Sequence, residues 1–231
     1  MIEDNLVLPF ETGDMVFHIL NRANQRARIF EHPGDYDAFE RVVGRTLEWV
    51  PMRILSYCVM PSHWHFILWP QRDGDLQAFV HRLTTTHVRR WHLHRHTVGA
   101  GHLYQATFKS FPVESDEHLL TVCRYVERNP VRAGLVDRAE SWAWGSARVR
   151  LLKPPQPRPF DLAAWPIAVP DDWEQFVNAP LTDAELEACR LSVTRGRPFG
   201  GPIWQAHTAR QLSLEATLRP RGRPRRTPPA E

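Results

Sequence analysis

The chain has 231 residues, 42% of them hydrophobic, and a net charge of +3 at neutral pH. This length and composition suffice for one packed domain with an appendage. No apolar run approaches membrane-spanning length, and the acidic first residues differ from a secretory signal peptide, so a soluble cytoplasmic protein is expected. Cys58, Cys123 and Cys189 are widely spaced, which predicts reduced thiols and argues against a zinc site built from cysteines.

Hydrophobic periodicity predicts strands and helices along the first 130 residues. The expected strands cover residues 15–21, the two parts of 53–68 on either side of Met60-Pro61-Ser62, and 102–113. The expected helices cover residues 35–49, a long stretch from Asp75 towards Gly99, and a stretch from Ser115 to Pro130. This order of elements predicts an α+β fold in which an antiparallel sheet carries helices on one face.

The ends of the third predicted helix carry clear signals. Ser115 can cap its N-terminus, with Asp116 and Glu117 favourably placed in the first turn. Pro130 is expected to end the helix, because the residue before a proline resists helical geometry.

The composition of the chain changes after residue 152. Residues 153–170 begin with a proline-rich run and are interpreted as a linker. Residues 171–231 are expected to form a C-terminal appendage, in which a capping box from Thr182 to Glu185 predicts a helix over about residues 183 to 192.

Two histidines, His63 and His65, lie one residue apart in a predicted strand. Successive side chains of a strand point to opposite faces, so both imidazoles emerge together while Trp64, Phe66 and Leu68 face a core. The pair can offer two nitrogen ligands to one metal ion, but a third ligand must come from elsewhere. The alternative is that both histidines are only structural.

Tyr125 and Asn129 lie four residues apart in the third predicted helix, on neighbouring positions of one face. On their own they are typical of a half-buried tyrosine and a helix stop. Together with the histidine pair, they suggest an amide oxygen for the metal and a phenol directed at the same point.

Two sequence segments resemble the motifs of the single-tyrosine HUH transposases, and among them the REP-associated tyrosine transposases of the IS200-like group. They are Met60-Pro-Ser-His-Trp-His65 and Arg124-Tyr-Val-Glu-Arg-Asn-Pro-Val-Arg-Ala-Gly-Leu-Val136. The similarity covers about residues 15–150. It departs from the usual motifs at Ser62, where asparagine is common, and at Tyr104, where tryptophan is frequent.

The resemblance implies a ferredoxin-like core and assigns residues 1–152 to the transposase domain. It implies that His63, His65 and Asn129 bind a divalent metal, Mg²⁺ or Mn²⁺, and that Tyr125 is the nucleophile. The implied substrate is single-stranded DNA, often folded as a hairpin, which is nicked and rejoined through a 5′-phosphotyrosine. Imidazole ligands alone would favour Mn²⁺ or Zn²⁺ over Mg²⁺.

Basic residues and aromatics occupy an interval without acids. No carboxylate occurs between Asp75 and Glu114, and a surface rich in arginine and aromatic side chains fits a phosphate backbone and stacked bases. The DNA-binding candidates in this interval are Arg82, Arg89, Arg90, Arg95 and Lys109. The alternative is a solvated helix face. In the tail, Arg221 and Arg223 flank a glycine in a pattern similar to an AT-hook, or to a nonspecific phosphate binder.

Three functions remain open from the sequence. The first is an enzyme that nicks and joins DNA through Tyr125, and the second is a DNA-binding regulator derived from a transposase without catalysis. The third, a hydrolase using metal-bound water, would need a carboxylate base near the site, and the sequence offers no obvious one; acids are absent throughout the basic interval. The sequence leaves both a monomer and a homodimer open.

Overall fold

The computed structural model describes residues 12–105, 107–154 and 157–219. The strands are β1 (Val16–Arg22), β2 (Arg53–Met60), β3 (His63–Trp69) and β4 (Lys109–Val113). The helices of the first half are α1 (Pro33–Trp49), α2 (Asp75–His94), α3 (Glu117–Glu127) and α4 (Asn129–Arg132). Those that follow are α5 (Ser146–Leu151), α6 (Trp173–Asn178), α7 (Asp183–Arg195), α8 (Pro202–Gln211) and α9 (Glu215–Leu218). None of the helices within these ranges is both long and apolar enough to span a membrane.

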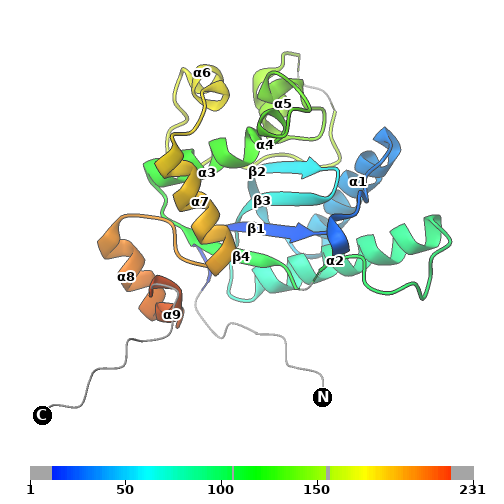
Figure 1. The fold of residues 1–231 in the computed structure, drawn as a ribbon, viewed down its shortest axis with the longest axis horizontal. Coiled ribbons are helices and arrows are strands. Elements are labelled where there is room, and N and C mark those ends of the chain that lie inside the picture. The colour runs from blue at the N-terminus through cyan, green and yellow to red at the C-terminus, as the bar shows by residue number, and fades with distance from the viewer. Residues whose placement is uncertain (1–11, 106, 155–156, 220–231) are drawn as a thin grey trace, which may run out of the picture.

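The four strands form one antiparallel sheet in the order β2-β3-β1-β4 (Figure 1). With α1 after β1 and α2 after β3, the chain follows the β-α-β-β-α-β path of ferredoxin-like domains. The predicted α+β class and ferredoxin-like core are therefore confirmed. The register pairs His63 with both Arg22 and Met60, so the histidine motif begins at one end of the sheet.

The first face of the sheet packs against α1 and α2. Trp64, Phe66 and Leu68 alternate along β3 towards this side, and each is at most 1% exposed. They meet the apolar stripes of the two helices, for which Phe39 and Phe79 are examples. This layer is the larger hydrophobic core of the domain.

The second face of the sheet is also covered, contrary to the expectation of helices on one face only. Ile67 and Phe111 make it apolar, so it needs a cover of its own. Leu119, Val122 and Val126 of α3 supply that cover. The sequence analysis considered only the two histidines of this face and did not predict that the rest of the face is apolar.

The helix that carries Tyr125 differs at both ends from the prediction. Asp116, not Ser115, is the N-cap, and its side chain accepts a hydrogen bond from the backbone N–H of His118. The helix ends at Glu127, and a second short helix begins at Asn129. Pro130 lacks an N–H, so it cannot continue the bonding of α3, but it is well suited to the first turn of α4.

The C-terminal segment packs directly against α3. Arg124 forms an ion pair of 2.5 Å with Glu185 of α7, and its guanidinium lies over the ring of Phe176 in α6. The predicted capping box at Thr182 and Glu185 is present, and α7 continues to Arg195, beyond the expected end at about residue 192. Earlier, Arg158 of the proline-rich segment pairs with Glu40 of α1. The division of the chain at residues 152 and 170 stays a prediction.

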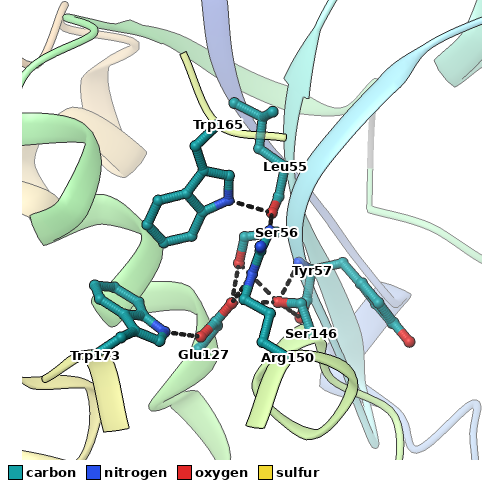
Figure 2. A network of polar contacts seen from close by, with 8 residues as sticks. All are labelled: Leu55, Ser56, Tyr57, Glu127, Ser146, Arg150, Trp165 and Trp173. Atoms are coloured by element: carbon teal, nitrogen blue, oxygen red, sulfur yellow. Dashed lines mark hydrogen bonds and ion pairs between the residues drawn. The ribbon is translucent and has the colours of Figure 1, made fainter. Parts of the chain in front are cut away.

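A buried carboxylate, Glu127, joins α3 to the sheet and to the segments that follow (Figure 2). It accepts hydrogen bonds from Ser56 of β2 (3.1 Å), Ser146 of α5 (2.6 Å) and the indole N–H of Trp173 (3.1 Å). The Nε of Arg150 lies 3.7 Å away. Burial raises the pKa of Glu127, while the charge of Arg150 and these hydrogen bonds oppose the rise.

We predict that Glu127→Ala lowers the free energy of unfolding by about 3 to 5 kcal/mol, because it leaves the buried charge of Arg150 without its carboxylate and removes the acceptor of the Trp173 indole. Urea denaturation monitored by tryptophan fluorescence measures the change. Glu187→Ala, at an exposed position of α7, is the control and should stay within about 0.5 kcal/mol of the wild type. A loss of under 1 kcal/mol for Glu127→Ala would contradict the assigned role of the network.

Candidate functional site

The imidazoles of His63 and His65 lie together on the face of the sheet that α3 covers. Their ring centroids are 5.1 Å apart. His65 is only 2% exposed, while His63, at the end of the sheet, is partly open. Burial, aided by the charges of Arg22 and Arg132, lowers the pKa of His63 to about 3, and burial holds that of His65 well below its ordinary value. Both rings are therefore neutral at physiological pH, which is the form that binds metals.

Tyr125 faces this histidine pair from α3. Its ring centroid is 6.0 Å from that of His65, and the two rings meet edge to face. The residue is 7% exposed and belongs to the core beneath α3. Burial raises the pKa of its phenol, and the nearby positive charges of Arg132, Arg190 and Arg22 oppose the rise. The phenol is therefore protonated at neutral pH.

Arg132 of α4 connects Tyr125 with Asn129. Its guanidinium carbon lies 4.4 Å from the centre of the Tyr125 ring, and its Nη2 donates a 2.8 Å hydrogen bond to Oδ1 of Asn129. This hydrogen bond fixes the orientation of the Asn129 amide. An amide oxygen has two lone pairs, so one remains for a second partner.

Three arginines contribute positive charge at Tyr125, and none of them has a carboxylate partner among the described residues. Arg22 ends β1 beside His63, Arg132 lies over the tyrosine ring, and Arg190 extends the site to α7. None of the three takes part in an ion pair with a described residue. The Nε of Arg22 is buried and has no hydrogen-bond partner within the same ranges. Such a set of uncompensated guanidinium groups is suited to an anion.

The other basic candidates are divided between free and paired side chains. Arg90 and Lys109 are exposed, and Arg89 lines a groove between α2 and residues 98–110 that has a volume of about 1180 Å³. Arg82 stacks on Trp49 at 4.3 Å, and Arg95 forms ion pairs with two acids of α1 and its approach. Arg221 and Arg223 lie outside the described residues.

The donor set of the site fits a divalent cation. Two neutral imidazoles and an amide oxygen carry no charge, so the cation would keep its full charge for a substrate. A second group of ligand-type residues lies elsewhere: the ligand atoms of Glu114, Asp116 and His118 are within 4.8 Å of one another. It is at the N-terminal end of α3, roughly 13 Å along the helix from Tyr125. Its carboxylates are already bonded, Asp116 to His118 and Glu114 to the N–H of Gly201.

Sequence reasoning missed several residues that contact or flank the site. His18 lies in β1 with its Nε2 2.8 Å from Nδ1 of His65, and Ser62 lies with its Oγ 3.1 Å from Nδ1 of His63. Arg132 belongs to the quoted tyrosine motif but was given no role. The alternation of β1 places His18 on the histidine face, so this residue could have been found. Arg190 gave no signal, because only the tertiary contact of α7 with α3 brings it near.

The ferredoxin-like sheet, the histidine pair and the facing tyrosine together define a class of DNA-processing proteins, and comparison with known proteins gives the family. The model of the family described as "Transposase IS200 like" matches residues 11–129. This is more than half of the chain, so the protein belongs to the IS200-like transposase family. The match includes the histidine pair, Tyr125 and Asn129.

Two individual relatives are similar to this chain at low sequence identity. A Haemophilus influenzae protein described as "Putative REP-associated tyrosine transposase" is 23% identical in a 121-residue alignment that covers 48% of this chain and 69% of the relative. The solved structure of a REP-associated tyrosine transposase bound to a REP hairpin is 20% identical, with a TM-score of 0.52. That alignment covers 74% of this chain and all of the other, and it supports the shared fold.

The burial of the histidines makes the free energy of unfolding depend on pH. Burial lowers the pKa of His18 to about 3, so below pH 6.5 the unfolded chain binds more protons than the folded one. The stability that a neutral His18 contributes is present above pH 6.5 and is lost as the pH falls towards 3. We predict that His18 accounts for about 2 kcal/mol of the loss in unfolding free energy between pH 7 and pH 5.

Urea denaturation of the wild type and of His18→Phe in metal-free buffer at the two pH values tests this. The loss between pH 7 and pH 5 should be smaller in the variant by that amount. Equal losses in the two proteins would show that the His18 imidazole is not kept neutral by the fold.

Proposed function

We propose that this protein nicks and rejoins single-stranded DNA through Tyr125, with His63, His65 and Asn129 as ligands of a divalent metal, Mg²⁺ or Mn²⁺. The observation that supports it most is the position of the Tyr125 ring, 6.0 Å from that of His65 in the same chain. Family membership supports the same chemistry, because transposases cut and rejoin DNA strands.

The chemistry requires that the Tyr125 oxygen attack a phosphorus atom of the DNA backbone. A bond forms from this oxygen to phosphorus while the bond to the 3′-oxygen breaks, which gives a 5′-phosphotyrosine and a free 3′-hydroxyl. The phenol loses its proton in the step and the leaving oxygen gains one, so the overall exchange needs no nucleotide fuel. A 3′-hydroxyl that attacks the phosphotyrosine reverses the reaction and joins the strands.

The chain's own residues would orient and stabilise the phosphate. Arg22, Arg132 and Arg190 lack carboxylate partners among the described residues, so they can donate hydrogen bonds to its oxygens. Arg132 also lies over the tyrosine ring, where its charge favours the phenolate that the attack requires. A divalent cation at His63, His65 and Asn129 would polarise a non-bridging oxygen and align the scissile bond.

The DNA would approach across the end of the sheet and along α2. The groove between α2 and residues 98–110 is lined by Asn21 and by residues of the interval without acids, including Arg89 and Phe108. The backbone N–H of Gln105, in this lining, bonds to the carbonyl of Arg22, which is next to the tyrosine site. A groove lined by an arginine and aromatic residues, with no acid among its described lining residues, suits single-stranded DNA.

The form of the DNA is proposed from the relatives. One solved relative is described as bound to a REP hairpin, so we propose a hairpin with a single-stranded flank as the substrate of this chain. The alternative function is a DNA-binding regulator without catalysis. It would keep the groove and the arginines but would not need the neutral histidine pair beside the tyrosine.

The decisive experiment incubates the protein with labelled hairpin DNA and Mn²⁺ or Mg²⁺, then denatures it. We predict a covalent DNA adduct for the wild type and none for Tyr125→Phe, which should still bind the hairpin within about threefold of the wild-type affinity, because only a hydroxyl is lost. His63→Ala should bind DNA and form little adduct.

Tyr36→Phe is the matched control, since this tyrosine of α1 does not line the groove and its hydroxyl donates a hydrogen bond to the carbonyl of Phe30. It should form the adduct at the wild-type level if it is folded. DNA binding without adduct by the wild type would favour the regulator, and a nicked product without adduct would favour a hydrolase.

The salt dependence of binding tests the DNA surface. We predict that Arg89→Gln, in the lining of the groove, lowers the slope of log affinity against log salt concentration by about 1, as expected for one lost phosphate contact. Arg95→Gln should change the slope much less, because its guanidinium is engaged by Glu31 at 2.6 Å and Asp35 at 3.0 Å. Fluorescence anisotropy at several salt concentrations gives both slopes. Equal changes in the two variants would argue against this path for the DNA.

A further inference from the structure

Both histidines of the pair have one ring nitrogen engaged by a neighbour. Nδ1 of His65 lies 2.8 Å from Nε2 of His18, and Nδ1 of His63 lies 3.1 Å from Oγ of Ser62. In each ring the Nε2 is therefore the nitrogen left for another partner. The two contacts come from different elements, β1 for His18 and the β2–β3 turn for Ser62.

Burial and ring stacking hold the side chain of His18 in place. It lies on β1, which has β3 on one side and β4 on the other, and it is 1% exposed. Its ring stacks on Phe111 with centroids 4.6 Å apart, and its centroid is 5.0 Å from that of His65. Burial and stacking therefore hold the ring with its Nε2 beside Nδ1 of His65.

We propose that His18 and Ser62 are positioning residues that fix the two imidazoles with Nε2 of both directed at one divalent cation. This inference rests on the proposed function and adds two residues to it. Second partners of this kind orient metal-binding histidines and select their protonated nitrogen.

The hydrogen bond between the two rings then has a required direction. A nitrogen that binds a cation must have a free lone pair, so the hydrogen of a neutral His65 is on Nδ1. That N–H donates to Nε2 of His18, which leaves the hydrogen of His18 on its own Nδ1. For His63, the same requirement makes Ser62 Oγ the acceptor of the Nδ1 hydrogen. The serine that departs from the usual asparagine keeps an oxygen acceptor at this position.

Metal affinity separates a positioning role from a purely structural one. The variants are His18→Phe, which keeps a ring against Phe111 but removes the acceptor, and His18→Gln, whose amide oxygen can replace it. Isothermal titration with Mn²⁺ in the absence of DNA gives the affinity. We predict that His18→Phe binds Mn²⁺ 10- to 100-fold more weakly, a range of about 1.4 to 2.8 kcal/mol. His18→Gln should stay within about threefold of the wild type.

His87→Phe is the matched control. His87 is also buried, stacks on Phe30 and is bonded to a hydroxyl, that of Tyr104, but it lies on the opposite face of the sheet. We expect its Mn²⁺ affinity to equal that of the wild type although its thermal stability falls. Ser62→Ala, at a partly exposed turn, provides a second variant that does not disturb the core, with an expected loss of three- to tenfold.

The outcomes separate this inference from the proposed function. If the wild type binds Mn²⁺ and His63→Ala does not, while His18→Phe and Ser62→Ala both bind like the wild type, the positioning role is overturned and the metal site stands. If the wild type and His63→Ala bind Mn²⁺ equally, both proposals fail. If His18→Phe does not fold, the Ser62→Ala affinity decides. With saturating Mg²⁺, nitrogen NMR should find the His65 hydrogen on Nδ1, and a hydrogen on Nε2 would contradict the proposal.

Discussion

The position of α3 depends on one buried carboxylate. Glu127 lies two residues from Tyr125 on one side and two from Asn129 on the other, and its hydrogen bonds reach β2, α5 and Trp173 (Figure 2). Residues two apart on a helix point in different directions, so this anchor leaves the tyrosine free to face the histidines. The distance between Tyr125 and the sheet is thus set by polar contacts as well as by the apolar cover. Since these contacts also hold α6, the C-terminal segment and the site are joined by the same network.

The layer that α3 and the C-terminal helices form on the second face of the sheet determines the charge of the site. Burial keeps the histidines neutral. Glu127, the acid nearest in sequence to Tyr125, is engaged in its network, and Glu185 of α7 pairs with Arg124. The arginines around the tyrosine therefore face no described carboxylate. A neutral ligand set beside uncompensated positive charge favours an anion such as a phosphate. The groove along α2 lies on the opposite face of the sheet, has no carboxylate among its described lining residues, and borders this site where the N–H of Gln105 bonds to the carbonyl of Arg22. The free thiols Cys58, Cys123 and Cys189 are buried within the same layer.

Much of the fold could be predicted from local sequence. The alternation of β3 and the helical spacing of α1 and α2 are properties of single elements, so periodicity found them, and the motifs brought the tyrosine and histidine segments together. The N-cap is Asp116 instead of the predicted Ser115, and a separate short helix begins at Asn129. Both features depend on hydrogen bonds that residue spacing does not reveal. Arg190 comes near the site only through the packing of α7 against α3, so its contribution required the three-dimensional structure. The alternation of β1 could have placed His18 on the histidine face, but its contact with His65 depends on strand pairing.

The central claim is that one chain gathers two imidazoles, an amide oxygen and a phenol around one cation. A crystal structure of the Tyr125→Phe variant with Mn²⁺ and hairpin DNA tests it most directly through the anomalous signal of the metal. The account predicts a manganese peak bonded to Nε2 of His63, Nε2 of His65 and Oδ1 of Asn129, with a DNA phosphate between it and Phe at position 125. A peak at Glu114, Asp116 and His118 instead, or none near the histidine pair, would contradict it.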